Sequence, residues 1–435
     1  LAFSFTGYLL PQLVAITAMP SLPADAVDRT ILMAVLVLAA AHFGYVYAKA
    51  PSPRFLAGSF DAERLEWGAL ASTMLGVYFF WKVSQLAPEA GSQWSGIITI
   101  YIFFASFLHV GFTLGVLLLT RQARWFTWRN WRLLMIVGIG LLVYLDRIIV
   151  HGRRTSTAVL AIILLYALWL NRRVLIPRAL MIAIAVIGMF FVNSAVDYRG
   201  TMLQDDRATW TGAGVSEIAR IDFRANFEQA FTRAPDVINA VWNMEGVSAA
   251  GSYDLGLRTW NKFVQRFVPG QIIGHDLKAS LYVDTAEKDA QRLGHRRATG
   301  TTSTVMSEAY GAFWYFGALL VALLGLAMKK LYIAALRFHL MAQLAIILLM
   351  TRAINFHGHA VSGFLVEIVE LFFFAGMVFW FARTRTAASP TPAMGFKQAN
   401  PSLRATPLGS KWRLARRSTS ALRKPLTQRT RRPMG

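Results

Sequence analysis

Hydrophobic residues occur along this chain in long blocks that short polar segments separate. Blocks of about 17–25 apolar residues have the length that a helix needs to cross the ~30 Å hydrocarbon core of a bilayer. About ten such blocks are present, and they predict an all-α polytopic membrane protein. Their ranges are Leu1–Met19, Thr30–Ala48, Trp67–Leu86, Ser95–Leu119, Trp131–Val150, Thr155–Leu170, Ile176–Ala195, Glu308–Met328, Leu331–Ile354 and Gly358–Ala382.

The blocks divide the chain into four parts. We expect seven transmembrane helices in residues 1–195, a large loop in 196–307, three helices in 308–382 and a basic tail in 383–435. The loop has thirteen basic and thirteen acidic residues, so we expect it to fold, mostly as helices, with candidates at Ser216–Ala234 and Leu255–Phe267. Because Leu1 already lies in an apolar block, we expect missing N-terminal residues and further spans before it.

Basic residues in the short connections fall on one face of the predicted topology. They include Arg54, Arg124, Arg172 and the pair Lys329–Lys330, whereas the opposite short connections have almost none. Such an excess of Lys and Arg is typical of cytoplasmic loops. The pattern therefore predicts a bacterial inner-membrane protein with a periplasmic large loop and a cytoplasmic tail.

Composition supports the membrane class and limits the chemistry. Only 16% of residues are charged, against about 25% in a soluble domain. The net charge is +22, and residues 383–435 carry thirteen Lys and Arg with no Asp or Glu. We expect this tail to be a disordered arm that binds anionic membrane lipids, and not nucleic acid, because it lacks interleaved aromatic residues. The absence of cysteine excludes disulfides and thiolate catalysis.

Charged residues gather at the outer end of the predicted fifth span, where arginine is disfavoured. They are Asp146, Arg147, His151, Arg153 and Arg154. In one interpretation the arginines reach lipid headgroups and Asp146 pairs with Arg147. In the other they form an anion site, because guanidinium groups bind phosphate oxygens bidentately and keep their charge.

A second basic set lies in the predicted loop. Its members are Arg199, Lys278, His295, Arg296 and Arg297. Each taken alone can be a solvated charge. Taken together, they can line the roof of a cavity whose floor is the turn that contains the arginines after the fifth span.

Glu308 opens the predicted eighth span. A carboxylate is favourable at a helix N-terminus, so a capping role is one interpretation. A general base is the other, and His295 is an alternative base.

His357 and His359 have no nearby carboxylate to complete a ligand set, so we expect no metal site. The sequence has no Walker glycine loop, GxSxG or HExxH motif, and it gives no support for nucleotide-driven transport.

Four stretches stand in order around the predicted loop. The first two are His151-Gly152-Arg153-Arg154-Thr155-Ser156 and Asp197-Tyr198-Arg199; the third combines Gly251-Ser252-Tyr253, Phe267-Val268-Pro269 and Lys278; the fourth runs from Thr302-Ser303-Thr304 through Glu308, Tyr310, Phe313 and Gly317. In these stretches residues 130–330 resemble the Wzy-type oligosaccharide repeat-unit polymerases, or O-antigen polymerases. Trp314 departs from the family's usual Gly, and no Pro follows Lys278.

The resemblance implies a metal-independent glycosyltransferase without a cofactor. It would move a growing glycan from undecaprenyl pyrophosphate onto a sugar hydroxyl of a new lipid-linked unit, in company with a chain-length regulator and a flippase. Arg153, Arg154 and Arg199 would bind pyrophosphate, and Lys278 and Arg297 would bind pyrophosphate or sugar. Arg147, Arg296 and Tyr310 would be further substrate-binding residues, and Glu308 or His295 would take the proton.

Three alternatives stay open at this point. O-antigen ligases share the overall layout and transfer glycan to another acceptor. A transporter or flippase for lipid-linked sugars would need polar residues through the bilayer midplane, and the predicted spans hold few. A structural or sensor protein has only the basic tail in its favour.

Overall fold

The structure is a computed structural model, and it describes residues 9–48, 58–86, 97–151, 153–174, 177, 179–180, 234–283, 290–297, 301, 303–354 and 361–384. These residues belong to one compact unit, Leu1–Thr384. The predicted tail, from Arg385 onward, lies outside the described residues, as do most of the predicted seventh span and the candidate helix at Ser216–Ala234.

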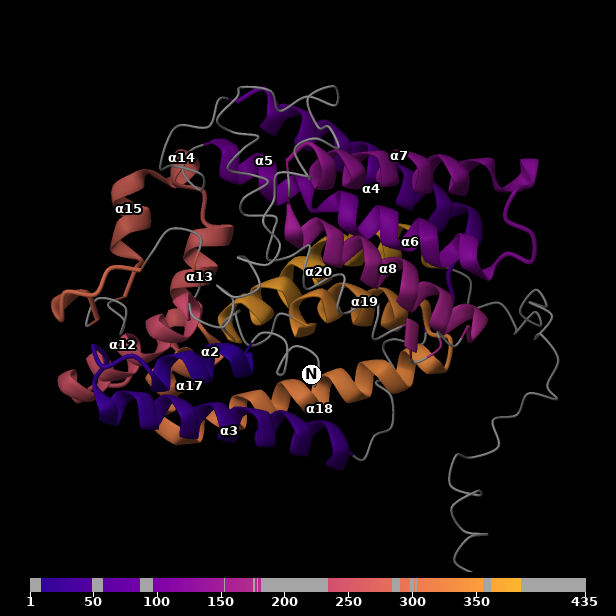
Figure 1. The fold of residues 1–435 in the computed structure, drawn as a ribbon. Helices are drawn as coiled ribbons and strands as arrows, with labels where there is room; N and C mark the ends of the chain where they lie inside the picture. The colour runs from indigo at the N-terminus through magenta and orange to yellow at the C-terminus, as the bar shows by residue number, and fades with distance from the viewer. Residues whose placement is uncertain are drawn as a thin grey trace, which may run out of the picture. The chain divides into compact units, whose positions relative to one another are not determined.

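The described part of the chain is all-helical (Figure 1), and its one extended pairing is an isolated bridge between Phe60 and Arg383. Its first helices are α2 (Leu10–Thr17), α3 (Ala24–Tyr47), α4 (Ala62–Ser84), α5 (Ile97–Ala105), α6 (Phe107–Arg121), η3 (Trp128–Asn130), α7 (Trp131–Ile149) and α8 (Arg154–Arg172). The later ones are α12 (Pro235–Ala250), α13 (Leu257–Phe267), α14 (Gly270–Ile273), α15 (His275–Ser280), α17 (Val305–Phe313), η4 (Trp314–Gly317), α18 (Ala318–Leu336), α19 (Leu340–Ile354) and α20 (Val361–Phe381).

Five helical segments among the described residues are long and apolar enough to cross a membrane. They are Ala24–Tyr47, Ile97–Arg121, Thr155–Arg172, Val305–Leu336 and Val361–Phe381. Each overlaps a predicted span. Helices α4 and α7 also lie where spans were predicted, although they are not among the five. The described part of the chain is therefore all-α and contains five helices that can cross a membrane.

One predicted connection is wrong. The pair Lys329–Lys330 was expected between two spans, but both residues lie inside α18, which continues to Leu336. The turn comes at residues 337–339, before α19. The Lys329 ammonium lies 4.6 Å from the centre of the Tyr45 ring, so α3 provides an aromatic partner for the charge.

Helices α3 and α18 lie side by side with their backbones close together (Figure 1). A Cβ atom added to Gly44 would lie 1.9 Å from the Ala322 carbonyl oxygen, and one added to Gly325 would lie 2.5 Å from the Ala41 carbonyl oxygen. Small residues at such contacts are the usual means by which membrane helices approach closely.

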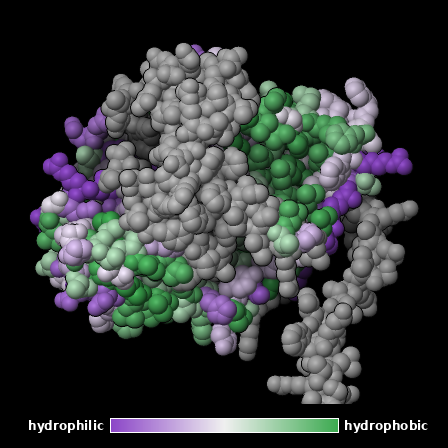
Figure 2. Space-filling model, viewed as in Figure 1, coloured by the Kyte–Doolittle hydropathy of each residue, from purple (hydrophilic) through white to green (hydrophobic). Residues whose placement is uncertain are grey.

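A second group of helices packs around α6. Helix α6 contacts α4, α7, α8 and α19, and α20 contacts α4, α6 and α19. Large hydrophobic side chains stay exposed on the outside, among them Phe43 and Tyr47 on α3, Tyr78 and Trp81 on α4, and Leu142 on α7. Figure 2 shows such side chains gathered over α3 and over α4 and α7. Exposed apolar surface of this kind suits a lipid environment.

The predicted large loop contributes helices that pack onto the apolar ones. Helix α13 confirms the expected helix at Leu255–Phe267 within two residues, and Pro269 follows it. Pro235 begins α12, where its missing amide costs nothing in the first helical turn. Helix α12 packs against α2, α3 and α17, while α13 packs against α20 and α17. The loop helices thereby bring polar residues to the N-terminal ends of α17 and α20.

Candidate active site

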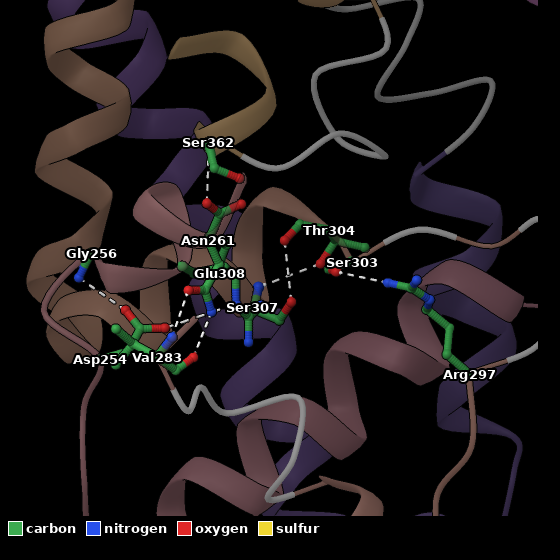
Figure 3. Close-up of polar contacts among 11 residues, drawn as sticks. Asp254, Gly256, Asn261, Val283, Arg297, Ser303, Thr304, Ser307, Glu308 and Ser362 are labelled. Atoms are coloured by element: carbon green, nitrogen blue, oxygen red, sulfur yellow. Dashed lines mark hydrogen bonds and ion pairs between the residues drawn. The ribbon is translucent and has the colours of Figure 1, made fainter. Parts of the chain in front are cut away.

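Glu308 lies in the first turns of α17. The Thr304 hydroxyl caps this helix by accepting a hydrogen bond from the Ser307 amide, 3.4 Å away. Glu308 is only 4% exposed, and its Oε1 accepts a hydrogen bond from the Ser362 backbone amide at 2.9 Å (Figure 3). Its Oε2 is buried and has no hydrogen-bond partner among the described residues. Glu308 therefore caps α20, not its own helix, and keeps one oxygen available.

Arg258, in the first turn of α13, is the positively charged side chain in the cavity of Glu308. Its side chain is buried, and none of its three guanidinium nitrogens has a hydrogen-bond partner in the described part of the chain. Its Nε lies 3.8 Å from Oδ2 of Asp254, which is also buried. A buried guanidinium with five unused donor hydrogens is costly unless a ligand or water satisfies it. Among the described residues these donors are therefore left for a ligand or water that enters the site.

The turn before α13 explains how Arg258 reaches this place. The Asp254 amide donates a hydrogen bond to the Gly311 carbonyl oxygen near the end of α17, at 2.8 Å. Oδ1 of Asp254 accepts from the Gly256 amide at 2.9 Å. Gly256 has a φ of +87°, a conformation that glycine adopts without strain. The turn thus fixes the start of α13 against α17, one helical turn before Arg258.

These groups open onto one cavity of about 260 Å³. Asp254, Arg258, Thr259 and Glu308 form its polar lining, and side chains of α17, α18 and α20 such as Phe313, Leu320 and Leu365 form its apolar lining. This volume is just below the about 300–1,000 Å³ of typical small-molecule sites. It is large enough for a small polar group.

A second ion pair fixes the other end of α13. Arg266 binds the Glu370 carboxylate on α20 and lies 3.4 Å from the Ser106 hydroxyl between α5 and α6. Arg258, Lys262 and Arg266 repeat every four residues, so they share one face of α13. This face carries three cations toward the candidate spans.

The arginines predicted after the fifth span lie elsewhere. The Arg147 guanidinium packs over the Phe80 ring at 4.1 Å. Asp146 lies 3.6 Å from Nε2 of His151. The Arg153 amide donates to the Arg147 carbonyl oxygen at 3.0 Å. Neither Arg147 nor Arg153 lines the cavity that contains Glu308. The side chain of Arg154 and all of Arg199 lie outside the described residues.

His295 sits in a separate polar cluster beside α12. Its Nε2 lies 2.9 Å from Oδ1 of Asn239, and its ring stacks on Trp242 at 5.7 Å. Burial lowers the pKa of His295 below its ordinary value of 6.5. Asn239 in turn donates to the Thr301 hydroxyl at 2.9 Å. His295 does not line the cavity of Glu308, so the two candidate bases occupy different places.

The remaining predicted residues that the structure describes do not line the cavity. Arg297 lies 3.4 Å from the Ser303 hydroxyl, just before α17, and Arg296 is exposed. Tyr310 is buried between the rings of Tyr253 and Tyr315. Lys278 donates to the Gln265 carbonyl oxygen at 3.3 Å, and burial lowers its pKa.

The structure therefore joins Glu308 to two residues that sequence reasoning missed, Arg258 and Asp254. One signal for Arg258 is present in the sequence. The segment Leu255–Phe267 is recognisable as a helix. Its three basic residues follow one another at intervals of four residues, so they lie on one face of that helix. No protein-family model, curated protein or solved structure matches the chain.

Proposed function

We propose that the protein polymerises lipid-linked oligosaccharide repeat units by transferring glycan from a lipid diphosphate to a lipid-linked acceptor. One observation supports this most: the buried Arg258 guanidinium shares a small cavity with the Glu308 carboxylate, and neither the guanidinium nitrogens nor Oε2 of Glu308 have a hydrogen-bond partner among the described residues. The pair offers an anion site beside a proton acceptor. The sequence resemblance of residues 130–330 points to the same chemistry.

In the proposed reaction an acceptor hydroxyl oxygen forms a bond to the anomeric carbon of the donor sugar. The bond from that carbon to the phosphate oxygen breaks, and the lipid diphosphate leaves with the electron pair. The proton of the hydroxyl passes to Oε2 of Glu308 and from there to water. Arg258 stabilises the charge that develops on the leaving diphosphate, where fixed donors in a water-poor site are most effective.

The dimensions of the site suit substrates that remain in the membrane. A cavity of about 260 Å³ takes the diphosphate and the reacting sugar carbon. The glycan would extend away from the cavity and the lipid tails would stay in the bilayer. Arg296, Arg297 and Lys278 remain proposed contacts of sugar or pyrophosphate along that path.

The experiment is a glycan gel from a strain that lacks the gene and carries wild-type, Arg258→Lys or Glu308→Gln protein. Arg258→Lys keeps a buried positive charge beside Asp254 but loses the bidentate fork. Glu245→Gln is the matched control, because Glu245 pairs with Arg29 at 2.8 Å outside the cavity. We expect long chains from wild type and control, and single repeat units from both site variants.

Other outcomes would reject parts of the proposal. Normal long chains from both site variants would remove the site assignment. Long chains that fail to reach the cell surface in the deletion strain would indicate a ligase. Lipid-linked units that accumulate in the cytoplasm would indicate a flippase.

A further inference from the structure

The connection between α6 and α7 forms a groove with the end of α8. This groove, here called the α6–α8 groove, has a volume of about 520 Å³. It is lined by Ala123, Trp125, Phe126, Leu168, Arg172 and Val174. It lies outside the candidate active site and shares no lining residue with it.

The groove lies at the level where two candidate spans end. The segments Ile97–Arg121 and Thr155–Arg172 both finish beside it. Tryptophan and arginine at the ends of spans are typical of the boundary between hydrocarbon and headgroups. A groove at the ends of two candidate spans fits the region where phospholipid headgroups meet their acyl chains.

Hydrogen bonds hold the exposed aromatic residues of this connection in place. The buried Asn130 side chain donates to the carbonyl oxygens of Arg124, at 2.7 Å, and Trp125, at 3.2 Å. Phe126 and Trp128 are nevertheless 86% and 89% exposed. Such fixed exposure of large apolar rings is unfavourable in water and favourable against lipid chains.

Arg172 closes one side of the groove. Its Nε donates to the Thr120 carbonyl oxygen at 2.8 Å, a second nitrogen donates to Gln122, and its guanidinium lies 5.7 Å from the Trp125 ring centre. Arg124, Arg129 and Arg173 are exposed nearby in sequence. Residues 121–132 and 171–174 contain no Asp or Glu, so the local charge is positive.

We propose that the α6–α8 groove binds an anionic phospholipid. One acyl chain would lie between Phe126 and Leu168, and the headgroup phosphate would lie at Arg172. The positive charge selects an anionic headgroup over a zwitterionic one, and the apolar walls select a lipid over a soluble phosphate. The proposal does not depend on the reaction proposed above.

The test is native mass spectrometry of the full chain in detergent with equal amounts of phosphatidylglycerol and phosphatidylcholine. We expect wild type to retain phosphatidylglycerol preferentially, and Arg172→Gln to lower that preference about fivefold. Arg64→Gln is the matched control, since it removes an exposed arginine that does not line the groove. Equal losses from both variants would overturn the proposal, because they would reflect overall charge alone.

A second residue keeps the test valid if Arg172→Gln disturbs folding. Phe126 is almost fully exposed, so its replacement leaves the core intact. We expect Phe126→Ala to lower retention of both lipids and Phe126→Asp to remove the preference for phosphatidylglycerol. Leu142→Ala, an exposed residue on α7, is the control and should change neither. Unchanged binding in both Phe126 variants, or displacement of the lipid by glycerol phosphate alone, would contradict the proposal.

Discussion

The backbone amide of Ser362 donates a hydrogen bond to Oε1 of Glu308, and this bond joins the first turn of α20 to the first turns of α17. Two candidate spans therefore meet at one carboxylate. A carboxylate at a helix N-terminus is stabilised by the unpaired amides and the helix dipole. Glu308 combines this structural bond with a second oxygen that has no hydrogen-bond partner among the described residues.

The two roles of Glu308 can be separated by substitution. Glu308→Gln keeps an oxygen that can accept the Ser362 bond but cannot take a proton at neutral pH. We expect its melting temperature to stay near that of wild type while glycan polymerisation is lost. Glu308→Ala leaves the buried amide unsatisfied at a cost of about 1–3 kcal/mol, and its melting temperature should fall. Full polymerisation by Glu308→Gln would leave only the structural role.

The ion pair between Arg266 and Glu370 should hold α13 against α20. Both side chains are mostly buried. Removal of one partner leaves a buried charge without its counterion, which costs about 3–5 kcal/mol. We expect Arg266→Met and Glu370→Met each to lower the melting temperature in detergent, and the double variant to lose less than the sum. Additive losses would show that the pair does not couple the two helices.

Gly317 permits the tight turn between α17 and α18. A Cβ atom there would lie 1.8 Å from the Ala309 carbonyl oxygen, one residue from Glu308. Gly317→Ala should therefore displace α17 and lower both the yield of folded protein and polymerisation. Gly363, next to Ser362 on α20, has open space around its Cα, so Gly363→Ala is the matched control. Similar behaviour of the two variants in size-exclusion chromatography and glycan gels would refute the packing argument.

The pH dependence of stability should contain a contribution from His295. Its pKa in the folded protein is lowered by burial, so the unfolded chain binds the proton more tightly. Neutral His295 makes its full contribution to the free energy of unfolding above about pH 6.5. This contribution falls as the pH drops from that value toward the pKa of His295 in the folded protein. We expect the wild-type melting temperature to fall more than that of His295→Gln between about pH 7.5 and 5.5. Identical falls would exclude this contribution.

The sequence predicted most of the described helices but placed several boundaries wrongly, above all the one between α18 and α19. Long apolar blocks are a strong signal, and α3, α7 and α20 coincide with them within a few residues, apart from the start of α3. The pair Lys329–Lys330 led to the wrong boundary, because two adjacent lysines between apolar blocks are typical of a cytoplasmic loop between two spans. In the structure Lys329 packs on Tyr45 of α3, a contact between residues remote in sequence. Hydropathy alone contains no information about such partners.

The candidate site was harder to predict than the helices. Glu308 stood out because it is a lone acid at the edge of an apolar block. Arg258 did not, since its position in an amphipathic helix fits a solvated face equally well. Its role depends on the turn at Asp254 and Gly256, which brings the start of α13 against Gly311 near the end of α17. Only the folded chain places these groups together.

The most direct measurement is chain growth by purified protein in proteoliposomes supplied with a fluorescent lipid-diphosphate oligosaccharide. Wild-type protein should form a ladder of longer glycans and release one lipid diphosphate for each unit added. Folded Arg258→Lys and Glu308→Gln proteins should form none. Ladders of wild-type length from both variants, with Glu245→Gln as the reference, would contradict the account of the site.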